Sequence, residues 1–496
     1  MNIVVVVVAM SSPPAPPLAA LSLTPPSSLA PPPQEALSPV APPPPTNTDP
    51  DQILVPSEEA ALVTLQVNFT RSNPCGTPGG NIVCDGGTNP PHRVVALSLE
   101  DCPANALLSS AALLNFTALA SLSFQNCPML PDLAPLDFTR HVTTLVVSAS
   151  LGRTRERVNA KKLPADWVAN FTELTTLSIS DVELDDSKGS GLFPITRSLP
   201  KVLTLIITST SIGGPLPKRT WPPSIDHIDV SLNKIEGSIP LELYRYTSLR
   251  HFDAHGNELD GALHPDIRLL SGLRYLDISG SGRITGSIPS EIGELSELRH
   301  LDLSNNNFSG TIPASMSGLA HLSFLNLAGN KLSGRIPESF SGLLNISTIN
   351  LSNNKLMGSI PLNLTFLTNL VSLDLSSNAL TGEIPFNDTF LAQLETLNLG
   401  QNPGLCYNDT LVKQQHSKLL AGIRSCSDND NNFLYAPVPS PLGLPSPPSK
   451  LSSKRTLDGV SRVIVVVVVI ILFLAAIVVL FAAFDVVDGD RERETT

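Results

Sequence analysis

One segment of the sequence recurs at regular intervals, which limits the folds open to this chain. The segment LRHLDLSNNNFSGTIP begins at Leu298, and a close copy, LSFLNLAGNKLSGRIP, begins at Leu322. Positions 1, 4 and 6 of the first copy are Leu298, Leu301 and Leu303, and this alternation is typical of a short strand with one buried face. Because one strand cannot bury that face alone, we expect successive units to stack into a parallel sheet.

Thirteen such units occupy residues 94–405. Their first core positions are evenly spaced from Leu298 onward, whereas the two intervals between Val142 and Val202 are longer than the others. The back of the array is therefore the more regular part. The units begin at Val94, Leu119, Val142, Leu174, Val202, Ile225, Leu249, Leu273, Leu298, Leu322, Ile346, Leu370 and Leu394.

Two further positions recur in the units. An Asn at position 9 would be costly to bury unless its amide bonds backbone groups of its own and adjacent coils, so we expect a ladder of such amides. A Gly at position 13 permits a backbone conformation that a side chain would forbid. The Asn residues are Asn233, Asn257, Asn306, Asn330, Asn354, Asn378 and Asn402. The Gly residues are Gly214, Gly237, Gly261, Gly286, Gly310, Gly334, Gly358 and Gly382.

The two ends of the chain differ in composition from the repeats. Residues 1–12 contain a short apolar run without a preceding Lys or Arg and form a weak signal peptide. Residues 13–50 and 436–462 are rich in Pro, so we expect a disordered segment and an extended stalk.

A transmembrane helix is expected at residues 463–484, a continuous apolar segment without a charged residue. At about 1.5 Å per residue it would span roughly 33 Å, enough to cross a hydrocarbon core. A buried soluble helix is the alternative interpretation. Residues 485–496 would form a short cytoplasmic tail, too short for a kinase domain.

Two features of the sequence bear on the orientation of this helix, and they oppose each other. Four basic residues precede the apolar segment within a few turns and two follow it, which opposes an outside N-terminus. Long domains translocate largely regardless of charge, however, and the cysteines and glycosylation signals described next require the secretory route. We therefore expect a single-pass plasma-membrane protein with its N-terminus outside.

Two features favour an extracellular array. Cys75 and Cys84 precede the repeats and Cys406 and Cys426 follow them, and disulfides at these two ends would imply an oxidising compartment. Nine N-x-Ser/Thr signals are more than the chain's composition alone would produce. They lie at Asn68, Asn115, Asn170, Asn307, Asn345, Asn350, Asn363, Asn387 and Asn408.

The unit L-x-x-L-x-L-x-x-N-x-L-x-G-x-I-P resembles that of leucine-rich repeat proteins of the plant extracellular type. The resemblance covers about two thirds of the chain and is most specific over residues 202–406. It implies an α/β fold, a right-handed leucine-rich repeat solenoid with a parallel β-sheet on the concave face, to which the sequence adds one C-terminal transmembrane helix.

The flanks of the array resemble the caps of that family. RVVALSL at residues 93–99 is similar to the junction that follows an N-terminal cap, here residues 51–93, and NPGLC at 402–406 is similar to the start of a C-terminal cap, here residues 406–435. In the first cap we expect Ser57 to begin a helix with Glu58 and Glu59 in its first turn.

The cysteines of the first cap depart from the family pattern, because eight residues without a Trp separate Cys75 from Cys84 where the family commonly has six. Cys102 and Cys127 fall at position 9 of the first two units. Free buried thiols and a bridge between adjacent coils both remain open for that pair.

The strand positions that do not enter the core are expected to form a concave ligand-binding surface. Neighbouring strands lie roughly 4.8 Å apart, so equal positions form columns. Rings beside Arg are typical of binding hot spots, whereas the alternative is that these residues only follow the family consensus. Asn350 lies at position 5, where a glycan would confine ligands to earlier units. The candidates are His227, His251, Tyr275, His300 and Phe324 at position 3, Arg250, Arg274 and Arg299 at position 2, and Asp229, Asp253, Asp277 and Asp302 at position 5.

Composition and motifs exclude several classes of function. A net charge of −12 with 32 Lys and Arg lacks the basic surface that binding to nucleic acid requires. The basic segment at residues 153–162 must leave the solenoid as a loop, either solvated or in contact with an acidic polymer. We find no catalytic motif, cofactor signature or metal-ligand spacing, and expect neither an enzyme nor a cofactor nor a metal.

The chain resembles kinase-lacking leucine-rich repeat receptor-like proteins of plants. This resemblance implies a cell-surface receptor-like protein that binds a peptide, protein or glycan ligand and signals through a partner kinase, a co-receptor. The alternative is a wall-associated or adhesive protein whose Pro-rich tracts act as spacers.

Overall fold

The computed structural model describes residues 54–65, 67, 75, 81–85, 91–102, 110–127, 137–149, 163–164, 168, 171–185, 191–408, 420 and 422–427. The expected signal peptide, Pro-rich segments, transmembrane helix, tail and basic loop lie outside these residues, as do Asn68 and Asn170. Within the described part of the chain, no helix is both long enough and apolar enough to cross a membrane.

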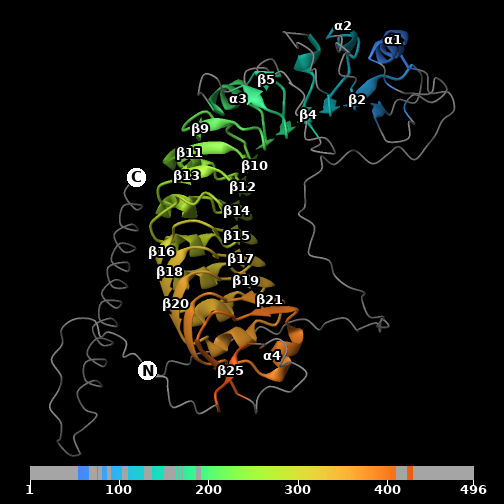
Figure 1. Cartoon of the computed structure of the whole chain (residues 1–496). Helices are drawn as coiled ribbons and strands as arrows, with labels where there is room; N and C mark the ends of the chain where they lie inside the picture. The colour runs from blue at the N-terminus through green and yellow to red at the C-terminus, as the bar shows by residue number, and fades with distance from the viewer. Residues whose placement is uncertain are drawn as a thin grey trace, which may run out of the picture. The chain divides into compact units, whose positions relative to one another are not determined.

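One sheet of 14 strands follows the whole described array (Figure 1). Strand β1 (Ile82–Cys84) is antiparallel to β2 (Val94–Glu100), and all later neighbours are parallel, with one strand from each repeat unit. Leu298, Leu301 and Leu303 are fully buried, as the two-residue period predicts. The other strands are β3 (Ser121–Gln125), β4 (Thr144–Ser148), β6 (Thr176–Ser180), β8 (Thr204–Thr208), β10 (His227–Asp229), β12 (His251–Asp253), β14 (Tyr275–Asp277), β15 (His300–Asp302), β17 (Phe324–Asn326), β19 (Thr348–Asn350), β21 (Ser372–Asp374) and β23 (Thr396–Asn398).

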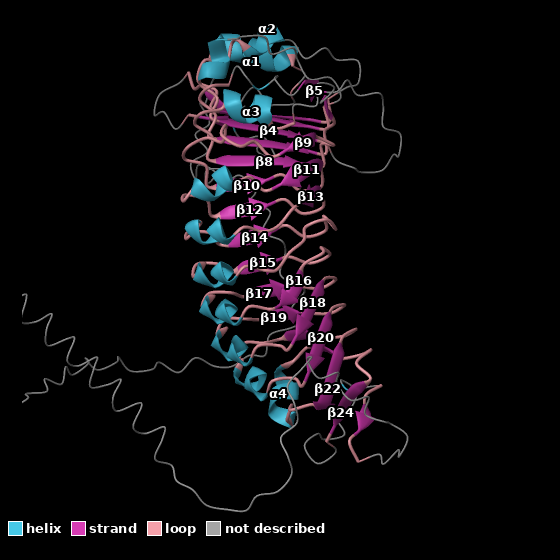
Figure 2. Ribbon diagram, turned by 90° about the vertical axis from the view of Figure 1, so that its left-hand side faces the viewer, coloured by secondary structure: helices cyan, strands magenta, loops and turns pink. Residues whose placement is uncertain are grey.

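A second row of short parallel strands was not predicted by the pattern of one strand per unit. Gly310 lies within one of them at φ 78°, a left-handed value that favours glycine, so the position-13 Gly bends a strand in this part of the array. Figure 2 shows this row along one edge of the described repeats and short helices along the other. The row comprises β9 (Gly213–Pro215), β11 (Lys234–Ser238), β13 (Glu258–Asp260), β16 (Ser309–Thr311), β18 (Lys331–Gly334), β20 (Lys355–Gly358), β22 (Ala379–Glu383), β24 (Gly404–Tyr407) and β25 (Arg424–Ser425), and β5 (Leu163–Pro164) pairs separately with β7 (Leu184–Asp185).

Most of the helices that close the regular coils are single 3₁₀ turns and not α-helices. The proline of the Ile-Pro pair precedes most of these turns, since its fixed φ suits the entry to a helix. Each turn places an apolar residue in the core, such as Ile292 or Phe340. The 3₁₀ turns are η2 (Asp137–Arg140), η4 (Leu241–Arg245), η5 (Pro265–Leu269), η6 (Ser290–Glu294), η7 (Ala314–Gly318), η8 (Glu338–Gly342) and η9 (Leu362–Phe366), and the α-helices are α1 (Pro56–Thr64), α2 (Ser110–Leu113), α3 (Phe193–Ser198) and α4 (Asp388–Gln393).

The position-9 amides form the predicted ladder between coils. Asn257 Nδ2 donates to the carbonyl of Val230 in the preceding coil at 2.9 Å and to that of Ala254 in its own coil at 3.0 Å. Its Oδ1 accepts from the backbone N–H of Ile235 at 2.9 Å. The same pattern, with donors and acceptor all used, occurs at Asn233, Asn330, Asn354, Asn378 and Asn402.

The ladder is interrupted at one coil. The unit beginning at Leu273 is one residue longer than its neighbours and carries Ser281 at position 9. Ser281 Oγ is buried without a hydrogen-bond partner among the described residues, and so is the Oδ1 atom of Asn306 in the next coil. In other coils this oxygen accepts a backbone N–H of the preceding coil. The extra residue in the unit beginning at Leu273 therefore moves that N–H away from Asn306 Oδ1.

The first helix begins earlier than expected, and Ser57 does not cap it. Helix α1 starts at Pro56 with Val55 at the N-cap, and no side chain caps its backbone. Proline suits the first helical position because its missing N–H would lack a partner there in any case. Glu58 is 1% exposed, although an acid in the first turn of a helix normally faces solvent.

Glu58 instead connects the cap to the sheet. Its Oε2 accepts from the backbone N–H of Val94 at 2.8 Å, at the start of β2. Burial raises the pKa of Glu58 above its ordinary value of 4.5, and the Val94 N–H opposes that rise. The folded chain thus binds this proton more tightly than the unfolded chain, so the contribution to stability is present at low pH and is lost as pH rises above 4.5.

Glu58→Gln should therefore stabilise the protein at neutral pH, because glutamine keeps the acceptor without a buried charge. The difference from wild type in thermal unfolding should shrink as pH falls below 4.5. Glu58→Ala is the control: it leaves the Val94 N–H without its partner and should cost about 1–3 kcal/mol. A Gln variant less stable than wild type at pH 7 would contradict this account.

Three disulfides join the six cysteines. Cys75 pairs with Cys84 and Cys406 with Cys426, as expected at the two flanks of the array. Cys102 and Cys127, whose state the sequence left open, also form a disulfide. This bridge connects the first two coils at position 9, where later units use the Asn ladder.

Candidate functional site

Five rings form a continuous stack on the sheet, which we call the ring column. Position 3 is in register along β10, β12, β14, β15 and β17, so the side chains lie above one another. Successive ring centroids are 3.9, 4.2, 4.2 and 4.3 Å apart, and the rings are within 13° of parallel. The members are His227, His251, Tyr275, His300 and Phe324.

Beside the ring column lies the acid column, which consists of Asp229, Asp253, Asp277 and Asp302 at position 5. The sequence placed these carboxylates on an open surface, but the last three are only 7–8% exposed. Each Oδ1 of the column accepts a backbone N–H two residues later, as Asp277 does from Ser279 at 2.9 Å. The neighbouring rings and the turn after each strand thus cover most of the column.

Burial removes charge from the histidines of the ring column. Desolvation lowers the pKa of His227 to about 4, that of His251 to about 3 and that of His300 to about 4. At neutral pH these imidazoles are uncharged, so each keeps a lone pair on one ring nitrogen. Desolvation, followed by the nearby carboxylates, also raises the pKa of Tyr275.

The carboxylates of the acid column repel one another. Desolvation, and then Asp253, raise the pKa of Asp229 and that of Asp277, which rises to about 6. His255 offsets part of this charge: its Nδ1 lies 2.7 Å from Asp253 Oδ1, and this hydrogen bond raises the pKa of His255 to about 9. His255 was not among the residues predicted from the sequence, because position 7 of most other units carries Ser, Gly or Ala.

The arginines at position 2 remain exposed at the start of each strand. Arg274 Nη2 lies 3.9 Å from Glu297 Oε2, a weak surface pair. Desolvation raises the pKa of Asp226, and the charge of Arg250 opposes part of that rise. The structure therefore brings all twelve predicted side chains onto one stretch of the sheet, with accessible cations beside partly covered rings and covered carboxylates.

The position-5 column continues with amides beyond Asp302. Asn326 Nδ2 donates to Asp302 Oδ2 at 2.8 Å, and Asn350 follows in register on β19. Asn350 Oδ1 accepts from Ser352, the hydroxyl residue of its own glycosylation signal. The other glycosylation candidates within the described residues lie away from these strands, and Asn345 and Asn387 are exposed.

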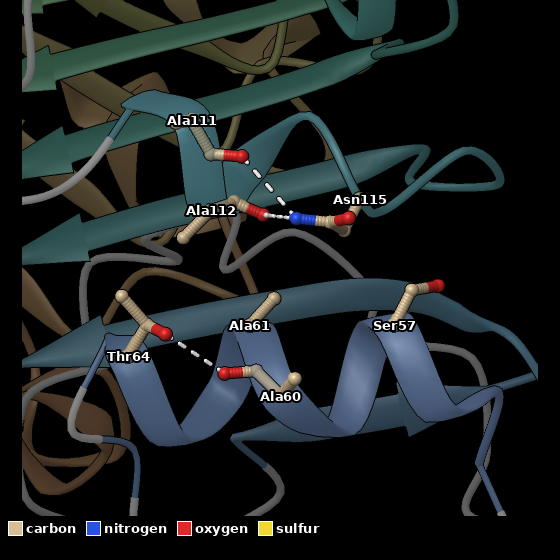
Figure 3. A pocket seen from close by; sticks show the side chains of 7 residues that line it. All are labelled: Ser57, Ala60, Ala61, Thr64, Ala111, Ala112 and Asn115. Atoms are coloured by element: carbon tan, nitrogen blue, oxygen red, sulfur yellow. Dashed lines mark hydrogen bonds between the residues drawn. The ribbon is translucent and has the colours of Figure 1, made fainter.

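A separate hollow of about 300 Å³ lies between α1 and α2 (Figure 3). It is lined by Ser57, Ala60, Ala61, Thr64, Ala111, Ala112 and Asn115. Asn115 Nδ2 donates to the carbonyls of Ala111 and Ala112 at 3.2 Å, so its amide is engaged by the wall itself. Because the lining holds neither a charged nor an aromatic side chain, the ring and acid columns are the stronger candidate site.

Comparisons with known proteins agree with the repeat architecture. Models of the leucine-rich repeat family match residues 269–332, 345–367 and 369–388. A search of curated proteins finds no match. The coil, the ladder and these matches together define a leucine-rich repeat protein. The chain belongs to the leucine-rich repeat family.

Solved structures with similar coils include three plant proteins. The plant peptide hormone receptor RGFR1 in complex with RGF2 is 26% identical over 60% of this chain and 52% of that chain, with a TM-score of 0.46. The Arabidopsis receptor kinase HAESA, in complex with the peptide hormone IDA and the co-receptor SERK1, is 23% identical over 64% and 63%, with a TM-score of 0.42. The SOBIR1 ectodomain from Arabidopsis thaliana is 32% identical over 27% and 73%, with a TM-score of 0.26. The chain spans about half the length of the first of these.

Proposed function

We propose that the sheet surface from β10 to β17 is the ligand-binding surface of a receptor-like protein. The observation that carries this proposal is the ring column, five stacked rings with exposed arginines just before three of their strands. Stacked rings lose little conformational entropy on binding, because their neighbours already hold them. Partly exposed rings beside Arg are typical of hot spots.

An extended peptide is the ligand class that suits this surface best. The ring column spans five adjacent strands, which at about 4.8 Å spacing extend over roughly 20 Å. An extended chain covers that length with about six residues. The exposed arginines would attract acidic groups of such a peptide, whereas the buried acid column offers little surface to a glycan or a protein.

The proposal places the protein at the plasma membrane. Residues 463–484 would supply the membrane span, and a partner kinase, a co-receptor, would carry the signal into the cell. The uncharged composition of that segment and the extracellular type of repeat support this placement.

The test is a binding screen of the full-length chain against a library of labelled peptides. For a peptide that binds saturably, His251→Ala combined with Tyr275→Ala should weaken binding by at least tenfold, because two central rings are lost. Thr348→Ala with Ser372→Ala is the matched control, since these side chains occupy position 3 on β19 and β21 outside the ring column. Equal losses in both double variants would contradict the proposed surface. If the ring variant keeps its peptide binding but the chain binds wall polymers through its Pro-rich tracts, the adhesive alternative would be favoured.

A further inference from the structure

Two clusters of metal-ligating atoms include carboxylates of the acid column. One consists of Asp277, His300 and Asp302, and the other of Asp253, His255 and Asp277. Within each cluster the ligand atoms lie within 4.8 Å of one another. The first cluster arises because β14 and β15 pair in register, which sets Asp277 opposite Asp302 and places His300 two residues before it.

The histidine of the first cluster has a ring nitrogen without a hydrogen-bond partner in the described part of the chain. His300 Nε2 is buried and has no hydrogen-bond partner among the described residues. A buried ring nitrogen without a partner is costly, and each such atom in a native protein calls for an explanation. In the second cluster, by contrast, His255 Nδ1 is already bonded to Asp253 Oδ1 at 2.7 Å.

Among the described residues, the two carboxylates of the first cluster have no Lys or Arg partner, and His255, the imidazole near Asp277, is bonded to Asp253. Asp277 and Asp302 are each 8% exposed, and neither pairs with a Lys or Arg within the described part of the chain. Their Oδ1 atoms accept the backbone N–H groups of Ser279 and Ser304, and Asp302 Oδ2 accepts Asn326 Nδ2. Backbone N–H groups and an amide compensate only part of two buried charges.

One imidazole nitrogen and two carboxylates are ligands that Zn²⁺ accepts, and four-coordinate zinc would leave one position for water or another ligand. Ca²⁺ is a poorer match, because it takes six to eight oxygen ligands and has no preference for imidazole. We propose that Asp277, His300 and Asp302 form a binding site for Zn²⁺ or a similar divalent transition-metal ion. The ion would satisfy the His300 nitrogen and neutralise the paired carboxylates at once.

From the sequence we expected no metal site. Metal motifs are recognised by short spacings, whereas here Asp277 comes from the coil that precedes the one with His300 and Asp302. The inference does not depend on the proposed peptide binding, because its test uses the metal ion alone.

The test is isothermal titration of ZnCl₂ into the full-length chain after removal of metals with a chelator. Wild type should bind one ion with micromolar or tighter affinity. His300→Phe removes the nitrogen but keeps a ring in the stack, as Phe324 does in the next coil, and should weaken binding at least tenfold. His227→Phe makes the same change at the other end of the ring column, outside both clusters, and should bind Zn²⁺ like wild type.

A second readout distinguishes this site from binding elsewhere on the chain. Co²⁺ in place of Zn²⁺ gives visible absorption bands that report its ligands, and these should change in His300→Phe and in Asp277→Asn but not in His227→Phe. The proposal is overturned if wild type binds no stoichiometric Zn²⁺, if His300→Phe binds it unchanged, or if Ca²⁺ binds as tightly with no effect of His300→Phe. Circular dichroism of each variant ensures that a loss of binding is not a loss of fold.

Discussion

Asn330→Ala should lower the free energy of unfolding by about 3–5 kcal/mol, the largest effect we expect from one substitution. Asn330 is 8% exposed, and its Nδ2 donates to the carbonyls of Leu303, Leu327 and Ala328 at 2.9–3.2 Å. Its Oδ1 accepts the N–H of Phe308 at 3.0 Å. Alanine would leave these backbone groups buried without that partner, and each such group costs about 1–3 kcal/mol before the coils relax.

Asn306→Ala is the matched comparison, because Asn306 occupies the same position one coil earlier and is similarly buried. Its Nδ2 makes three comparable bonds, but its Oδ1 has no partner among the described residues. The variant should therefore cost about 1–3 kcal/mol less than Asn330→Ala. Urea unfolding gives the two values, and hydrogen exchange at Phe308 should increase only in Asn330→Ala. Equal costs would show that Asn306 Oδ1 is satisfied in solution.

The repeat period predicted the features of the fold that recur from coil to coil. Leu298, Leu301 and Leu303 are buried as the two-residue alternation requires, and the position-9 amides bond backbone groups as their cost of burial requires. Equal positions align because each unit contributes one strand to a parallel sheet. The ring column was predictable on this basis, since it needs only the strand positions and their register.

Other features depend on contacts between coils that a repeat pattern does not contain. The second row of strands is separate from the main sheet and forms only where neighbouring coils approach there as well. The burial of Asp253, Asp277 and Asp302 results from the turns and rings around them and not from their own positions, which looked exposed. The burial of Glu58 was equally hidden from the local pattern, because its partner Val94 lies 36 residues away.

Gly293→Ala should destabilise the protein by about 3 kcal/mol, although other coils accept a side chain at this place. Gly293 is the fourth residue of its 3₁₀ turn, where η5 has Arg268 and η9 has Thr365. In η6, however, a methyl group on Gly293 would lie 2.5 Å from the carbonyl carbon of Ser315 in the next coil and still closer to its oxygen. A backbone neighbour cannot rotate away, so the two coils must separate, and overpacking of this kind costs about 1–3 kcal/mol.

Gly272→Ala is the control for this prediction. A methyl group there would meet only the Thr247 and Leu249 carbonyl oxygens, at 3.6 and 3.9 Å, which are ordinary contacts. Alanine also restricts the unfolded chain, so we expect this variant to be neutral or to gain up to about 1 kcal/mol. Thermal and urea unfolding should therefore show a clear loss of stability only in Gly293→Ala. Because the clash joins η6 to η7, hydrogen exchange should increase at both turns in that variant. If Gly293→Ala proves as stable as wild type, the spacing of these two coils in solution must be wider than the structure shows.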